Sequence, residues 1–319
     1  MKKRSGFRLV IEVTKQTFKD FSNDKVFKMA AALSYSTVIA LPALLIVLIW
    51  VSGIFYNPED IRGGLLNTMN ELLGREAVTQ IQDVMENTKF DYSGAWAKAL
   101  GVATLLLSAT GVFGEIQDSI NTIWSLKTKP KAGIIKVLIN RLLSFSLIVS
   151  LGFILIVSLV INALISALVD NIQQSFPEVP ILVFYILNQV FIFGILLVLF
   201  STIFKVLPDA KIKLRQVLLS SMITALMFML GKFGIEMMLS GSRTVSAYGS
   251  AGAVIVILLW VYYSSVILYL GAEFTQAYLK VKGERIKPNR YAVWVEKQEV
   301  EVKSNTEASK ENAPQPARK

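Results

Sequence analysis

Residues 244–272 read TVSAYGSAGAVIVILLWVYYSSVILYLGA and contain no Asp, Glu, Lys or Arg. An α-helix rises ~1.5 Å per residue, so about 20 apolar residues cross the ~30 Å hydrocarbon core of a bilayer. A charge-free run of 29 residues therefore predicts a helix that spans a membrane.

Five further charge-free runs precede it, at residues 29–58, 99–114, 142–169, 179–204 and 216–231. Four of the six runs exceed the ~18 residues that indicate a span, and the two shorter ones continue as helical pattern to Trp124 and Leu239. The composition agrees, because 18% of the 319 residues are charged whereas soluble domains carry roughly 25%. We therefore predict an all-α, polytopic membrane protein with six transmembrane helices between residues 29 and 280.

The first run is too long for the apolar core of a signal peptide, so we treat it as an uncleaved span.

The 33 Lys and Arg residues are distributed unevenly between the loops. Residues 1–28, 115–141, 205–215 and 273–319 hold 27 of them, and the alternate loops hold 6. Cytoplasmic loops are rich in Lys and Arg, so both termini are predicted to be cytoplasmic. The net charge of +10 is therefore mainly a consequence of topology, and we expect no nucleic-acid partner.

The chain contains no Cys and no His. Disulfides, Cys or His metal sites, imidazole bases and a Ser-His-Asp triad are thereby excluded. Phosphate-binding, dinucleotide-binding and zinc motifs are also absent. We expect no catalytic set, no metal and no cofactor, and the protein is interpreted as a non-enzyme.

Three segments flank or interrupt the spans. Residues 1–28 form an amphipathic cytoplasmic segment, in which an apolar row is separated from Arg8, Lys15 and Lys19. This pattern suits an interfacial helix on an anionic leaflet, and equally a helix packed on the bundle's cytoplasmic end. Residues 57–97 are expected to form a small external helical cap, and residues 281–319 a cytoplasmic, largely disordered tail. The apolar row consists of Phe7, Val10, Ile11, Thr14, Phe18 and Phe21.

A row of small or polar residues follows one helical face of the second span, at steps of three or four. Such a face is costly in lipid, which favours a position facing the bundle interior or an aqueous cavity. Close helix packing with the two carboxylates at the cytoplasmic rim is an equal alternative. The row consists of Thr104, Ser108, Gly111, Glu115, Asp118 and Thr122.

Four other features of the spans bear on function. Pro42 frees a backbone carbonyl in the first span, and proline can kink a helix. Lys232 and Glu236 are one turn apart, so they either pair or extend separately to water. The small residues at 249–252 allow either close backbone approach or a flexible outward entrance. Trp260 is too central for an aromatic belt, so it is either packed or lines a cavity.

Several motifs together resemble the YihY/BrkB family of bacterial inner-membrane proteins. They are Ala31-Ala32-Leu33-Ser34-Tyr35 with Leu41-Pro42, Ile120-Asn121-Thr122-Ile123-Trp124, Leu207-Pro208, Tyr248-Gly249-Ser250-Ala251-Gly252-Ala253, Leu259-Trp260-Val261-Tyr262 and Gly271-Ala272-Glu273. The resemblance covers about residues 10–280 and implies an inner-membrane location, six helices and cytoplasmic termini. The recurrent Asn and Glu of the family correspond to Asn121 and Glu273, and the family supplies no catalytic set.

We interpret the chain as a transporter or a lipid flippase-like protein with a polar cavity inside the bundle. Membrane lipids and an anionic or amphipathic substrate are the expected partners. A scaffold acting through the 57–97 cap is an alternative. A membrane-bound ribonuclease, the older label of the family, would need Glu115, Asp118 and Asp209 within about 4–5 Å of each other. The candidate cavity residues are Tyr35, Pro42, Ser108, Glu115, Asp118, Asn121, Lys232, Glu236, Arg243, Tyr248, Trp260 and Glu273.

Overall fold

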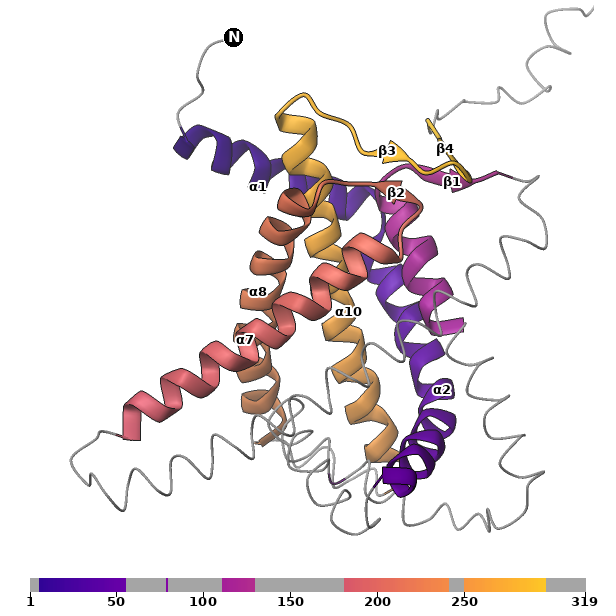
Figure 1. Cartoon of the computed structure of the whole chain (residues 1–319), viewed down its shortest axis with the longest axis vertical. Coiled ribbons are helices and arrows are strands. Elements are labelled where there is room, and N and C mark those ends of the chain that lie inside the picture. Colours follow the sequence, from indigo (N-terminus) through magenta and orange to yellow (C-terminus); the bar gives the residue numbers. More distant parts are fainter. Residues whose placement is uncertain (1–5, 56–78, 80–110, 130–180, 241–249, 297–319) are drawn as a thin grey trace, which may run out of the picture.

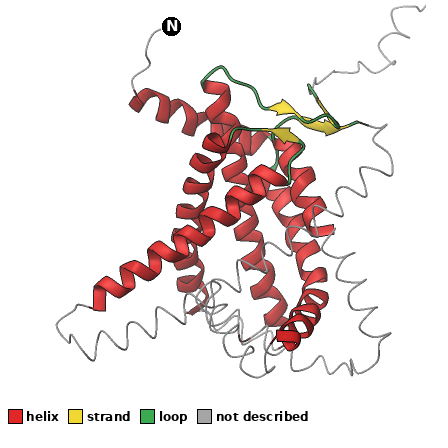
Figure 2. Ribbon diagram, viewed as in Figure 1, coloured by secondary structure: helices red, strands yellow, loops and turns green. Residues whose placement is uncertain are grey.

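The computed structural model describes residues 6–55, 79, 111–129, 181–240 and 250–296. These residues are mostly helical, and two short sheets lie together at one end of the bundle (Figure 2). We call that end the sheet end. The labelled helices are α1 (Gly6–Asn23), α2 (Val26–Phe55), α7 (Ile181–Val206), α8 (Leu214–Ser240) and α10 (Ser250–Val281). Residues 111–123 form a further helical stretch. The strands are β1 (Leu126–Thr128), β2 (Ala210–Lys211), β3 (Lys287–Pro288) and β4 (Ala292–Trp294).

Three described helices are long and apolar enough to cross a bilayer, at Ile186–Val206, Leu214–Ile235 and Ile255–Val281. They correspond to the fourth, fifth and sixth predicted spans. Helix α2 carries the first predicted span and continues through Pro42 as one helix of 30 residues. The cap at 57–97 falls almost wholly outside the described residues, as does most of the second and third spans. The number six therefore remains a prediction from the charge-free runs.

Helix α10 lies at the centre of this arrangement (Figure 1). It packs against α1, α2 and α8, and α7 packs against α8. The buried core runs through these contacts and includes Val26, Phe204, Val217 and Tyr269, each fully buried. Three helices thus depend on one central span for their packing.

Helix α8 has its apolar and polar faces reversed relative to a water-soluble helix. Its large apolar side chains are exposed, whereas Ser220, Ser221 and Thr224 are completely buried. This reversal is expected where the surroundings are acyl chains and small polar residues mediate helix contacts. The exposed row consists of Leu214, Leu218, Met222, Leu226, Leu230 and Phe233.

Most buried hydroxyls along the spans bond to their own helix. Thr224 Oγ1 donates to the Ser220 carbonyl at 2.8 Å, and Thr275 Oγ1 donates to the Gly271 carbonyl at 2.9 Å. Ser265 donates in the same way, to Val261. A hydroxyl satisfied by the preceding turn can be buried without a ligand. These residues therefore support helix packing and are not evidence of a polar channel.

Two glycines bring α8 and α10 into close contact. A Cβ on Gly271 of α10 would overlap the Thr224 hydroxyl and lie 3.0 Å from Phe204 Cζ. A Cβ on Gly231 of α8 would overlap the Tyr263 ring. The absence of a side chain at both places leaves room for the Tyr263 ring and for the Thr224 and Phe204 side chains, and small residues of this kind are typical of membrane helix contacts.

The chain segment after α10 folds across the sheet end. Gly283 terminates α10 with a φ of 75°, and the Glu284 N–H donates to the Leu279 carbonyl at 2.9 Å. The segment then pairs antiparallel with two others, β3 with β2 and β4 with β1. Residues 282–296, which the sequence assigned to a tail, are thus part of the folded bundle, while residues 297–319 lie outside the described chain.

Replacing Gly271 by Ala should destabilise the protein, because the added methyl forces α10 away from Thr224 and Phe204. We expect a lower apparent unfolding temperature for purified Gly271→Ala in detergent. Gly234→Ala on α8 is the matched control, since a Cβ there meets nothing within 4 Å. Adding Thr224→Ala to the Gly271→Ala variant should raise the unfolding temperature again in part, because it removes the hydroxyl that the new methyl overlaps. Equal unfolding temperatures for Gly271→Ala and Gly234→Ala would contradict this account of the α8–α10 contact.

Candidate functional site

A buried amide–carboxylate pair joins the helical stretch at residues 111–123 to the loop before α8. Asn121 Nδ2 donates to Asp209 Oδ2 at 3.2 Å, and the Asp209 backbone N–H donates to Asn121 Oδ1 at 2.8 Å. The two residues are only 4% and 6% exposed. The side-chain amide thus uses its donor and its acceptor on a single partner, which fixes the position of the loop.

Two further segments bond to Asp209. Thr128 Oγ1 of β1 donates to Asp209 Oδ2 at 3.1 Å. The Asn289 N–H, from the segment after α10, donates to the Asp209 carbonyl at 2.8 Å. One carboxylate and its backbone therefore tie together four parts of the chain. A buried charge needs such hydrogen bonds to offset its desolvation.

Trp124 connects the same region to α10. Its Nε1–H donates to the Ala272 carbonyl at 3.0 Å, and its ring is almost completely buried. The next residue along α10, Glu273, is 0% exposed. A carboxylate buried within a span is costly and is by default a functional candidate. Asn121, Trp124 and Glu273, all drawn from the sequence motifs, are thus gathered at the sheet end.

The polar row predicted on the second span is less buried than Asn121, Trp124 and Glu273. Asp118 and Thr122 are exposed, and Glu115 is half-buried. The buried polar residues of this helix are Gln117, Ser119 and Asn121. Ser119 lies beside the phenol of Tyr269 in α10. The described helices therefore leave the Asp118 face open and pack against the opposite face.

The other candidate residues are dispersed. Tyr35 is 66% exposed on α2. Trp260 is packed, with its ring centroid 5.3 Å from that of Phe228 in an edge-to-face arrangement. Pro42 and Glu236 lie on α2 and α8, where the structure describes the backbone alone. Ser108, Arg243 and Tyr248 lie outside the described residues.

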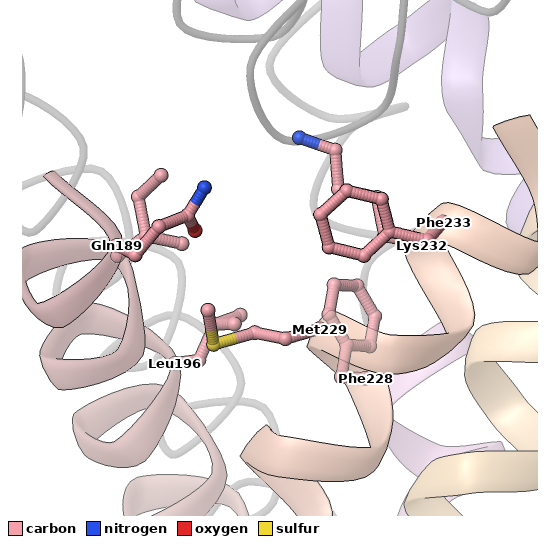
Figure 3. A pocket seen from close by; sticks show the side chains of 7 residues that line it. Gln189, Leu196, Phe228, Met229, Lys232 and Phe233 are labelled. Atoms are coloured by element: carbon pink, nitrogen blue, oxygen red, sulfur yellow. The ribbon is translucent and has the colours of Figure 1, made fainter. Parts of the chain in front are cut away.

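A groove lies between the middle of α7 and the half of α8 that is remote from the sheets. Gln189 and Lys232 lie across from each other at one end of it, and apolar side chains line the remainder (Figure 3). The space between the two helices is about 350 Å³ when the open region at its mouth is included, so it is a shallow groove rather than an enclosed cavity. The sequence patterns predicted Lys232 as a site residue but not Gln189. The one hint of Gln189 in the sequence is that it is a polar residue within the fourth charge-free run. The apolar lining consists of Ile192, Leu196, Phe228, Met229 and Phe233.

The position of Lys232 along α8 indicates where the polar end of the groove lies relative to the length of the span. It lies 18 residues after Leu214, which corresponds to ~27 Å of helix. The hydrocarbon core is ~30 Å thick, so the stretch from Leu214 to Lys232 is long enough to cross most of it. The apolar part of the groove, towards Leu196 and Phe228, then extends into the bilayer interior.

The described acids do not form a metal site. Among residues 6–55, 79, 111–129, 181–240 and 250–296, no three or more acidic side chains come together as metal ligands. Asp209, one of the three acids needed for a nuclease, bonds to Asn121 and Thr128. The ribonuclease alternative thus gains no support from this part of the chain.

Comparisons with known proteins agree with the motifs. The sequence profile of the family described as Virulence factor BrkB matches residues 17–293, from α1 into β4. A UPF0761 membrane protein of Alkalilimnicola ehrlichii is 26% identical over 275 residues, covering 85% of this chain and 59% of that relative. One of Kangiella koreensis is 26% identical over 262 residues, covering 81% and 61%. One of Psychromonas ingrahamii is 24% identical over 287 residues, covering 85% and 91%.

The chain therefore spans about three fifths of the length of the first two relatives and most of the third. No solved structure matches it.

Replacing Asn121 by Ala should weaken the sheet end. It removes both hydrogen bonds to Asp209 and leaves a buried carboxylate less satisfied, which costs about 1–3 kcal/mol. We expect a lower apparent unfolding midpoint in detergent. Thr122→Ala, the exposed neighbour on the same helix, is the control and should have little effect. If the two variants unfold alike, Asn121 does not hold the loop as described.

Proposed function

Because the chain belongs to the virulence factor BrkB family of membrane proteins, we propose that it binds an anionic amphiphile in the groove between α7 and α8 and moves it across the bilayer. The observation that carries this proposal is the groove itself. A lipid has one charged end and one long apolar end, and the groove has the same division (Figure 3).

The charged end of the substrate fits beside Lys232. An ammonium group near the bilayer boundary attracts anionic headgroups, and the Gln189 amide adds a hydrogen-bond donor and an acceptor. The apolar lining below them runs from Gln189 to Leu196 on α7, which is ~10 Å of helix, and can contact the part of an acyl chain nearest the headgroup. A neutral or cationic substrate would gain nothing from the ammonium, so an anionic lipid is the favoured class.

The walls of the groove differ from the rest of α8. Met229 lines the groove, and the neighbouring Leu230 is 72% exposed on the outer face of the same helix. Methionine adapts its shape to varied apolar partners, which suits a site for flexible chains. Phe228 forms the back of the groove and is supported by Trp260 behind it. Trp260 is then a support for the wall and does not contact the substrate.

We also propose that the sheet end faces the cytoplasm of the inner membrane. It carries the basic loops at 205–215 and 280–290, and positive loops remain cytoplasmic. The polar end of the groove then opens to the outer leaflet of that membrane. A lipid bound there is held with its headgroup at the outer surface.

The lipid-transfer proposal predicts flux of a labelled anionic lipid. Protein reconstituted in vesicles with fluorescent phosphatidylglycerol should make more of the probe accessible to an external quencher than protein-free vesicles. Met229→Trp fills the groove and should reduce the rate several-fold, whereas Leu230→Trp, on the lipid-facing side, should leave it unchanged. Lys232→Glu should reduce the rate and Lys232→Arg should retain it. A rate equal to that of protein-free vesicles would refute the proposal.

The orientation can be tested by labelling single cysteines, since the natural chain has none. Lys213→Cys at the sheet end should react with a membrane-impermeant maleimide only after the inner membrane is opened. Arg243→Cys, in the alternate loop, should react in spheroplasts with an intact membrane. The reverse pattern would place the sheet end outside.

A further inference from the structure

Helix α1 presents three distinct faces. The first packs against α10 through Val13, Thr17 and Asp20, all buried. The second is a row of large apolar side chains that remains exposed, with Phe7 at 75%, Ile11 at 51% and Phe18 at 61%. Contacts with α10 therefore cover the first face, and the row of large apolar side chains on the second face is left exposed.

The third face carries the charges. Arg8, Lys15 and Lys19 are exposed and lie together on one side of the helix. With 3.6 residues per turn, the cations lie about 80° around the axis from the apolar row, and the buried face lies more than about 120° from both. A helix that contacts protein, hydrocarbon and water at once requires this division. A helix packed only on protein would need one apolar face.

The placement of α1 suits such a boundary. Helix α1 projects sideways from the bundle at the sheet end and does not run along the upright spans (Figure 1). Its rotation is fixed by Asp20, whose carboxylate pairs with Lys280 of α10 at 3.4 Å and accepts bonds from Gln16. Lys25, with a φ of 56°, forms the turn into α2. The apolar row thus has a fixed direction relative to the spans.

We propose that α1 is an interfacial anchor whose row of Phe7, Val10, Ile11 and Phe18 is inserted into the headgroup–acyl boundary of an anionic leaflet. The occupant is a lipid surface because the apolar row is flanked by cations and lies at the end of the bundle that bears the basic loops. Anionic headgroups attract Lys and Arg near the surface, and the apolar row supplies the hydrophobic part of the binding. The anchor sets the depth of α10 through the Asp20–Lys280 pair.

The absence of native cysteine makes the test direct. Spin labels are attached to Ile11→Cys and Phe18→Cys on the apolar row, and to Lys15→Cys and Lys19→Cys on the charged face. The full-length protein is reconstituted in phosphatidylethanolamine–phosphatidylglycerol vesicles. The ratio of collisions with oxygen to collisions with a water-soluble nickel complex should be several-fold higher at residues 11 and 18 than at residues 15 and 19.

Two results would overturn the proposal. Equal ratios at all four sites would mean that the apolar row is in water. Low collision rates with both reagents at residues 11 and 18, with spin–spin broadening that grows with the protein-to-lipid ratio, would identify a second copy of the chain as the occupant.

A second comparison tests the lipid charge. Replacing phosphatidylglycerol by phosphatidylcholine, or making Lys15→Glu with Lys19→Glu, should lower the ratio at residue 11. An unchanged ratio would refute the requirement for an anionic leaflet. Helix α1 contributes no residue to the α7–α8 groove, so these outcomes are independent of lipid transfer.

Discussion

The buried carboxylate of Asp209 is the constraint on which the sheet end depends. Three chain segments that are distant in sequence, at residues 121–128, 209 and 289, meet here through hydrogen bonds from Asn121, Thr128 and Asn289. A carboxylate removed from water needs such donors, and the Asn121 amide and the Thr128 hydroxyl both donate to it. The strand pairs beside it contain two or three residues each, too few to hold the segments without the central polar contact. The short sheets and the Asp209 contacts therefore depend on each other.

Sequence patterns predicted the helices well because lipid imposes a simple rule. A span must exclude charge over about 20 residues, and three described spans lie where the charge-free runs do. The strands were missed because β2 and β3 are two residues long, too short to show a periodic pattern. Their pairing is a tertiary effect of the segment after Gly283 returning across the bundle.

The site was only partly predictable for a related reason. A helical row identifies residues that share a face, but it does not indicate which neighbour covers that face. Asp118 and Thr122 of the predicted row are exposed, whereas Gln117 and Asn121, on another face of the helix, are buried. Asn121 and Glu273 were identified through sequence motifs, whereas Gln189 needed the structure, because its importance comes from lying opposite Lys232 on another helix.

The packing of α8 differs on its two sides, and this difference has a mechanical consequence. Towards α10, the places of the missing side chains at Gly231 and Gly271 are filled by the Tyr263 ring and the Thr224 side chain, so that no added methyl group fits. Towards α7, the larger Phe228 and Met229 meet Ile192 and Leu196 across a groove. Tightly interlocked side chains resist separation, whereas flexible side chains can rearrange at small cost. Separating α7 from α8 at the groove therefore costs less packing energy than separating α8 from α10 at Gly231 and Gly271.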